Sequence, residues 1–107
     1  MSLASTPQPP YYAVIFSSIR KNDDPEYHRM ALLMDELAKE QPGFLGFETA
    51  RDMLGISVSY WKDVESIQKW KINVAHIEAQ DKGKSDWYKS YKVRVAKVER
   101  EYFFETE

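Results

Sequence analysis

The chain has 107 residues, no cysteine and a formal net charge of −2 at pH 7. This length suits one domain with a single hydrophobic core. The lack of cysteine excludes disulfides, thiolate zinc sites and a cysteine nucleophile, and it is consistent with the cytoplasmic location that we expect. The slightly acidic balance provides no overall basic field, so we expect no nucleic-acid partner.

The first ten residues differ in composition from the rest of the chain. Residues 1–10, "MSLASTPQPP", are small, polar and proline-rich, so we expect a disordered tail or residues added for expression. One domain is expected over residues 11–107. Its first segment, Tyr11 to Ile19, is apolar on both alternating faces, which predicts a strand covered on both sides. This run is too short to span a membrane, and we expect no membrane association.

A helix and two strands are predicted next. Residues 22–43 change to helical periodicity, with Met30 and Met34 on one apolar stripe and a "QPG" stop at the end. Residues 44–52 and 55–61 then have the composition of two strands, and a glycine turn joins them.

A second helix and a last strand complete the chain. In residues 62–83, Asp63 is a suitable N-cap, and the β-branched segment around Asn73 is expected to interrupt the helix. One face of this helix carries Ile67, Trp70, Val74 and Ile77. Residues 92–104 predict a long strand whose apolar alternation changes phase. A bulge near residues 96–97, or a change of packing surface, would explain the switch.

The predicted order β-α-β-β-α-β is ferredoxin-like, an α+β fold with two helices on one face of a four-stranded antiparallel sheet. Tyr12, Val14 and Phe16 are expected to make the opposite sheet face apolar as well. Such a face would expose a patch of about several hundred Å². Because the chain has no third helix to cover it, a second copy of the chain is the simplest cover, and we expect a homodimer.

The stretch "KWKINVAHIEAQ" contains the candidates for chemistry on the second helix. His76 lies on a polar stripe with Lys69, Asn73 and Gln80. One interpretation places His76 on the solvated flank of the helix. The other makes it an acid–base group or clamp for a phenol at the edge of a cavity. Trp70 is either a packed core residue or the flat wall of a ligand site, and both roles are compatible.

Other residues are candidate ligand contacts, although plain core packing explains each of them as well. Thioethers and aromatic rings adapt to flat apolar ligands, so the candidate walls are Met30, Met34, Phe44, Phe47 and Tyr60. Ser17 or Ser59 could orient a ligand oxygen, but neither has the surroundings of a nucleophile. No metal-ligand spacing is present, so we expect no metal site.

Four segments together resemble the antibiotic biosynthesis monooxygenase (ABM) domain family. They are "QPGFLGFETARD", "GISVSYWKDVESIQKWK", "HIEAQDKGKSDWY" and "YKVRVAKVEREY", and they are most similar to small bacillus-type members without a known activity. The resemblance implies a dimeric α+β barrel, in which two sheets pack face to face and the last strand reaches toward the partner. The family includes cofactor-independent monooxygenases of aromatic polyketides, quinol monooxygenases and haem-degrading monooxygenases.

The resemblance carries over to individual residues only in part. Trp61 and Trp70 keep the family's spacing, and Trp70 matches the tryptophan that lines the site in the oxygenases. Gln80 stands where haem-degrading members have their iron-binding histidine, and an amide is a poor ligand for haem iron. Residues 17–18 are serines where those members have an asparagine. His76 matches a histidine that many members share.

Together these features predict an ABM-type monooxygenase that oxidises a small electron-rich aromatic, such as a phenol or quinol, without metal or flavin. Such a substrate, once deprotonated, can itself transfer an electron to O2. The alternatives are a non-catalytic module that binds a small ligand or haem, and a haem-degrading monooxygenase. We expect no cofactor, with haem disfavoured by Gln80.

Overall fold

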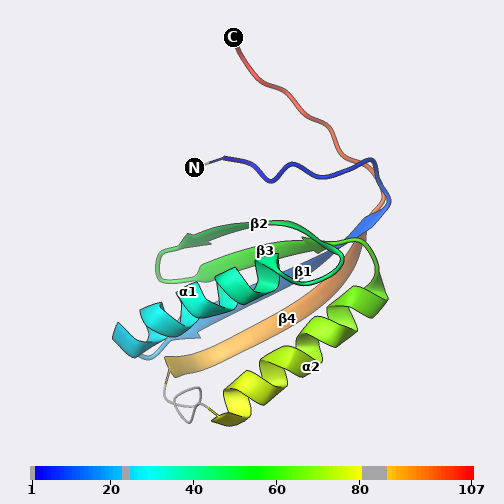
Figure 1. Ribbon diagram of the computed structural model, residues 1–107. Helices are drawn as coiled ribbons and strands as arrows, with labels where there is room; N and C mark the ends of the chain where they lie inside the picture. The colour runs from blue at the N-terminus through cyan, green and yellow to red at the C-terminus, as the bar shows by residue number, and fades with distance from the viewer. Residues whose placement is uncertain (1, 23–24, 81–86) are drawn as a thin grey trace.

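The computed structural model describes residues 2–22, 25–80 and 87–107 (Figure 1). Its elements are β1 (Tyr11–Arg20), α1 (Pro25–Lys39), β2 (Phe44–Arg51), β3 (Gly55–Trp61), α2 (Val64–Gln80) and β4 (Tyr88–Val98). The order β-α-β-β-α-β confirms the predicted ferredoxin-like α+β fold.

The four strands form one antiparallel sheet with the order β2-β3-β1-β4. Both helices lie over the same face of this sheet (Figure 1). β1 is hydrogen-bonded to β3 on one side and to β4 on the other, which agrees with its β-branched and aromatic composition. Within the described part of the chain, neither helix is long and apolar enough to cross a bilayer.

The position of Trp61 shows which residues of β1 face the helices. Trp61 of β3 stacks on Trp70 of α2, so Trp61 points toward the helices. Tyr12 is its partner across the ladder, and alternation places Val14 and Phe16 on the same side. The prediction that these three β1 residues form the uncovered face is therefore wrong, because the register assigns them to the helix side.

The face away from the helices, called the open face below, is nevertheless largely apolar where β1 and β3 form it. Its β1 residues are Tyr11, Ala13, Ile15, Ser17 and Ile19. On β3 the register aligns Tyr60, Val58 and Ile56 with Ala13, Ile15 and Ser17. Ile19 and Ile56 are 43% and 41% exposed. We therefore still expect a second copy of the chain to cover this side of the sheet, through these residues instead of Tyr12, Val14 and Phe16.

The segments before β1 and after β4 meet at one end of the open face. The backbone N–H of Ala4 donates to Glu48 Oε2 at 2.9 Å, and the Thr6 hydroxyl donates to the Tyr11 hydroxyl at 3.0 Å. Tyr11 in turn donates to Glu101 Oε1 at 2.9 Å. These contacts leave Tyr11 only 5% exposed. The division into a tail at residues 1–10 and one domain at residues 11–107 stays a prediction.

Two local predictions are wrong, for identifiable reasons. The β1–β4 register continues without a shift past Ala96, and its irregularity lies instead at Ile19/Arg20. No bulge is needed, because β1 offers apolar partners on both faces and the chain leaves the sheet after Val98. α2 is also continuous through Asn73, whose amide donates to the Gln41 side chain at 2.9 Å instead of competing for the helix backbone.

The connections around α2 follow local chemistry. The Ser66 N–H donates to Asp63 Oδ1 at 2.8 Å, which confirms Asp63 as the N-cap. Gly43, in the "QPG" turn, has φ of 86°, and a Cβ there would meet the Ser66 side chain. Glycine is therefore required both by the backbone angle and by the close approach of α2.

Candidate functional site

A pair of tryptophans lies between α2 and the sheet, at the end where β1 begins. The ring centroids of Trp61 and Trp70 are 6.1 Å apart with an interplanar angle of 26°. Trp61 has no exposed surface, and its Nε1 donates to Ser59 Oγ at 2.8 Å. Phe44 meets Trp61 edge-on at 5.4 Å. The indole N–H is satisfied inside the protein, so the pair has a fixed orientation.

The structure brings four of the residues proposed from sequence to this place. Trp70, Ser59 and Phe44 belong to the tryptophan pair's surroundings. Phe47 is the ladder partner of Ser59, and its ring lies 6.3 Å from that of Phe44. These four residues, from three elements, therefore lie with Trp61 in one cluster on the helix side of the sheet.

Tyr60 and Ser17 are on the opposite side of the sheet. Tyr60 pairs with Ala13 on the open face, and its hydroxyl donates to Glu48 Oε1 at 2.7 Å. Burial and this hydrogen bond raise the pKa of Tyr60 to about 12. Ser17 pairs with Ile56 on the same face. Neither residue can share a ligand with Trp70 while the sheet separates them.

The two methionines of α1 lie at different depths. Met30 is 8% exposed and belongs to the core, while Met34 is partly exposed. Both positions fit core packing, and a ligand could reach Met34 more easily than Met30.

His76 is separated from the tryptophan pair by the helix itself. Val74, which is partly buried, lies about 200° around the helix from His76 at 100° per residue. The His76 side chain is exposed on the outer side of α2. The side chain of Gln80 lies outside the described residues. The geometry therefore supports Trp70 in an internal site and leaves the role of His76 a prediction.

An apolar surface continues from the tryptophan pair along β1 and β4. Val14 and Phe16 of β1 pair with Val95 and Val93 of β4 on the helix side. Val93 and Val95 are 49% and 54% exposed although they face α2, which runs beside β4 in Figure 1. We call these four residues the apolar floor. Its exposure means that α2 does not seal this side of the sheet.

A second aromatic group ends the apolar floor. The Phe16 ring stacks on Tyr91 at 5.4 Å and meets Tyr88 edge-on at 5.6 Å. Tyr27 of α1 also meets Tyr88 edge-on, at 5.6 Å. Burial raises the pKa of Tyr88, and its hydrogen bond with Tyr27 raises it further. The Tyr88 phenol therefore stays a neutral hydrogen-bonding group at physiological pH.

The two aromatic groups mark the length of the helix-facing surface. Trp61 pairs with Tyr12, whereas Gly55 pairs with Ser18, six residues further along β1. At about 3.3 Å per residue this distance is roughly 20 Å. The surface between them is long enough for a flat aromatic molecule of more than one ring.

Sequence reasoning overlooked several residues of this surface. Phe16 was assigned to the wrong face, and Val93, Val95 and Tyr88 were not proposed as ligand contacts. The alternation in "YKVRV" does place Val93 and Val95 on one face. Only the pairing with β1 identifies that face as the helix side.

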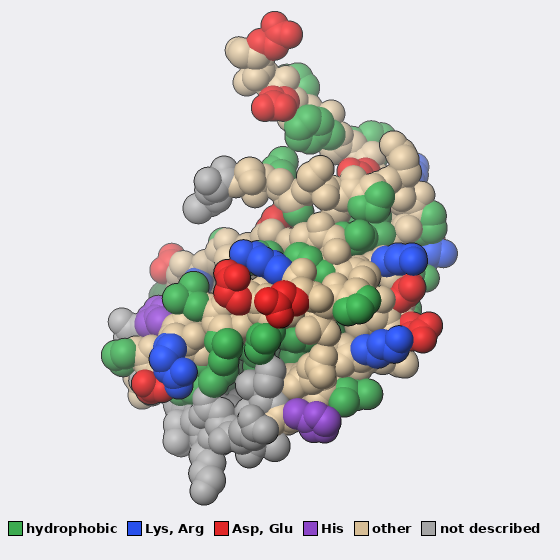
Figure 2. Space-filling model, viewed as in Figure 1, with side chains coloured by type: hydrophobic (Ala, Val, Ile, Leu, Met, Phe, Trp, Pro, Cys, Tyr) green, Lys and Arg blue, Asp and Glu red, His purple; other side chains and the backbone are tan. Residues whose placement is uncertain are grey.

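The remaining chemistry of the described residues is limited. Among residues 2–22, 25–80 and 87–107, no three His, Asp or Glu side chains gather as a metal site would require. Figure 2, seen from the helix side, shows exposed hydrophobic side chains among charges of both signs. The described residues on this face form no extended basic patch of the kind that binds nucleic acid.

Comparisons with known proteins agree with this architecture. The chain is 50% identical over 105 residues to YqjZ, an uncharacterised protein of Bacillus subtilis, covering 96% of this chain and 92% of YqjZ. It superimposes on SnoaB, a cofactor-independent oxygenase from Streptomyces nogalater, with a TM-score of 0.73 and 10% identity, over 91% and 100% of the two chains. A putative antibiotic biosynthesis monooxygenase from Nitrosomonas europaea gives a TM-score of 0.65 and 12% identity, over 86% and 92% of the chains.

These similarities have different weight. A scan against known families finds no family model that matches the chain. Identities of 10% and 12% to the solved oxygenase structures show the fold alone, whereas 50% identity across nearly the whole chain shows common family membership. The chain therefore belongs to the same family as YqjZ of Bacillus subtilis, and it has the ferredoxin-like fold of the antibiotic biosynthesis monooxygenase domain proteins.

Proposed function

We propose that this protein is a homodimeric ABM-type monooxygenase that oxidises a small electron-rich aromatic, phenol-like or quinol-like, without metal or flavin. The observation that carries the proposal is the stacked Trp61–Trp70 pair, which continues into the half-exposed apolar floor. Flat aromatic walls next to an unsealed apolar surface suit a flat aromatic ligand. The shared fold with SnoaB, a cofactor-independent oxygenase, is consistent with this chemistry.

The reaction balances without an external reductant. A phenol with hydrogen on the ring carbon opposite its hydroxyl group reacts with one O2 to give a quinone and one water. The phenol loses its proton, the phenolate transfers an electron to O2, and one oxygen atom bonds to the ring. The O–O bond then breaks, and the second oxygen leaves as water with the two substrate hydrogens. The chain's residues bind the ring, hold it in place and exclude water from it.

Oxygen uptake with 1-naphthol tests the proposal. The metal-chelated protein should consume O2 and form 1,4-naphthoquinone in equal amounts. Trp70→Ala should lower kcat/KM by about tenfold or more because the aromatic wall is lost, and Trp70→Phe should retain part of the activity. Ile72→Ala is the matched control, since Ile72 is on the same helix and 58% exposed.

The same experiment separates the alternatives. Binding of phenols and hydroquinones without O2 uptake by the wild-type protein would replace the oxygenase with a non-catalytic binding module. A haem titration followed by addition of a reductant tests the haem-degrading alternative, which requires spectral loss of the bound haem.

His76 as acid–base group stays a prediction of the sequence. Its exposed position on the outer side of α2 does not support this role, and the proposed reaction does not require it. A large loss of turnover in His76→Ala, with 1-naphthol binding unchanged, would assign His76 to the chemistry. The predicted cytoplasmic location rests on the cysteine-free sequence.

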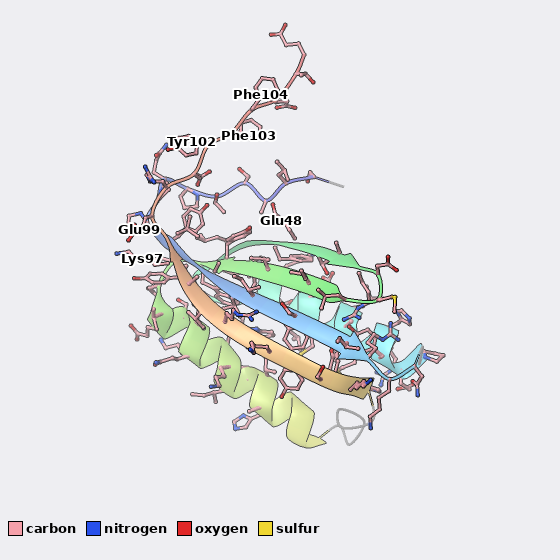
Figure 3. The ribbon with its side chains drawn as sticks, turned by 180° about the vertical axis from the view of Figure 1, so that it is seen from behind. Glu48, Lys97, Glu99, Tyr102, Phe103 and Phe104 are labelled. Carbon is pink, nitrogen blue, oxygen red and sulfur yellow. The ribbon has the colours of Figure 1, made fainter. Side chains whose placement is uncertain are left out.

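The homodimer is part of the proposal, and the C-terminal segment supports it. Beyond β4, the chain extends away from the sheet, as Figure 3 shows from behind. Tyr102, Phe103 and Phe104 in this segment are 88%, 70% and 83% exposed. Residues 99–107 also contain four glutamates, whereas β4 carries the exposed basic residues Lys89, Lys92, Arg94 and Lys97. An acidic aromatic segment of one copy is thus complementary to the basic β4 of another.

Sedimentation of the wild-type chain and two variants tests the dimer. Replacing Tyr102, Phe103 and Phe104 together by serine should weaken dimerisation by about tenfold or more, because exposed aromatics are frequent interface anchors. Deletion of residues 105–107 is the milder control. A monomeric wild-type chain at micromolar concentration would overturn the homodimer.

A further inference from the structure

A guanidinium is held in place at the far end of the helix-facing surface. Arg51, the last residue of β2, pairs with Gly55 of β3. A Cβ on Gly55 would collide with the Arg51 guanidinium, so this group lies across the glycine backbone. Its Nη2 donates to the hydroxyl of Ser18, which is only 1% exposed. The Gly55 backbone and the buried Ser18 hydroxyl therefore fix the position of the exposed Arg51 guanidinium.

Within residues 2–22, 25–80 and 87–107, this cation has no carboxylate partner. Among the residues that the structure describes, Arg51 forms no ion pair. Its guanidinium carbon is 5.9 Å from the centroid of the Tyr27 ring, and that of Arg20 is 4.0 Å from the same centroid. An arginine has five N–H donors in a planar fork, and Ser18 accepts from one of them. The rest are suited to an anion with two oxygens.

The arginine adjoins the apolar floor. Ser18 follows Phe16 by two residues on the same face of β1, a distance of about 7 Å. The Phe16 ring is flanked by Tyr88 and Tyr91. A ligand with its ring on the apolar floor would therefore reach Arg51 with an acidic group attached to that ring.

We propose that Arg51, positioned by Gly55 and Ser18, binds the carboxylate of an aromatic acid whose ring lies on the apolar floor. This inference rests on the proposed function, and it narrows the substrate class from phenols in general to hydroxylated aromatic acids. The carboxylate accepts hydrogen bonds from the planar guanidinium at one end. The hydroxylated ring lies toward Trp70 at the other end, where the oxidation takes place.

A matched pair of probes tests the carboxylate site by calorimetry. The wild-type protein should bind 6-hydroxy-2-naphthoate about tenfold more tightly than 2-naphthol, the same ring system without the carboxylate. Arg51→Met keeps the aliphatic length and removes the charge, so it should abolish this preference while 2-naphthol binding is retained. Arg29→Met is the control, because Arg29 is an exposed arginine on α1 whose guanidinium pairs with Glu26.

Gly55→Ala provides a second variant that leaves the charge in place. The added methyl group displaces the Arg51 guanidinium, so the preference for the acid should fall as in Arg51→Met. Circular dichroism and thermal melting establish that each variant is folded. Equal affinity of the wild-type protein for the two probes, or an unchanged preference in folded Arg51→Met, would overturn the carboxylate site.

The failure of this inference differs from a failure of the proposed function. Preferential binding of 6-hydroxy-2-naphthoate, together with no O2 uptake in the presence of 1-naphthol, would support the carboxylate site and refute the oxygenase. Oxidation of 1-naphthol with no preference for the acid would refute the carboxylate site alone.

Discussion

The hydrogen bond inside the tryptophan pair gives a quantitative prediction about stability. Trp61 has no exposed surface, and its Nε1 donates to Ser59 Oγ at 2.8 Å. In Ser59→Ala the indole N–H is left buried without an acceptor, which should cost about 1–3 kcal/mol of unfolding free energy. In Trp61→Phe the N–H is removed together with part of the ring, and replacement of a core tryptophan by this smaller ring should cost about 2 kcal/mol.

The double variant distinguishes the hydrogen bond from simple loss of volume. Once Trp61 is phenylalanine, no buried N–H needs the Ser59 hydroxyl as acceptor. Ser59→Ala should then lower the unfolding free energy only slightly. The sum of the losses of unfolding free energy in the two single variants should therefore exceed the loss in the double variant by about 1 kcal/mol or more. Urea unfolding at one fixed protein concentration measures all four proteins, because the stability of a dimer depends on concentration.

Additive effects would refute the reasoning. If the double variant equals the sum of the single variants within about 0.5 kcal/mol, the Trp61–Ser59 hydrogen bond does not hold the indole. Thr49→Ala is a useful control, since Thr49 bonds Ser57 at an exposed position of the same strand pair. Thr49→Ala should change the unfolding free energy by no more than about 0.5 kcal/mol.

Two further predictions concern the turn before β2 and the open face. Gly43→Ala should lower the unfolding free energy by more than about 1 kcal/mol, because φ at this residue is 86° and the new methyl group would meet the Ser66 side chain. A melting temperature equal to that of the wild-type protein would contradict this. Tyr60 should ionise near pH 12 by tyrosinate absorbance, since burial and the hydrogen bond to Glu48 raise its pKa from 10.0. Because this pKa is higher in the folded state, its contribution to stability is complete below pH 10 and is lost as the pH rises toward 12. Glu48→Gln should move the ionisation to lower pH, and an unchanged midpoint would exclude Glu48 as a cause.

Much of the fold could be predicted from residue order. Helical periodicity in residues 22–43 and 62–83, and β-branched alternation elsewhere, gave the β-α-β-β-α-β succession. The stripe that Trp70 shares with Ile67 and Val74 predicts that its ring points inward, and the structure confirms that this ring stacks on the buried Trp61 of the sheet. These features depend on contacts within a few residues, which a sequence displays directly.

The sides of the sheet could not be predicted in this way. β1 is apolar on both faces, so its alternation is compatible with either orientation, and a shift of one residue exchanges the faces. Tyr60 and Ser17 were expected beside Trp70, and the register places them on the open face.

By itself, the sequence determined the elements, their order and the inward direction of Trp70. The tertiary structure decided which side chains share a face, including the meeting of Arg51 with Ser18 across 33 positions of the chain. The physical reason is that such contacts arise from the pairing of β2 with β3 and of β3 with β1. Pairing register is set by the packing of all four strands together, and no single segment contains that information.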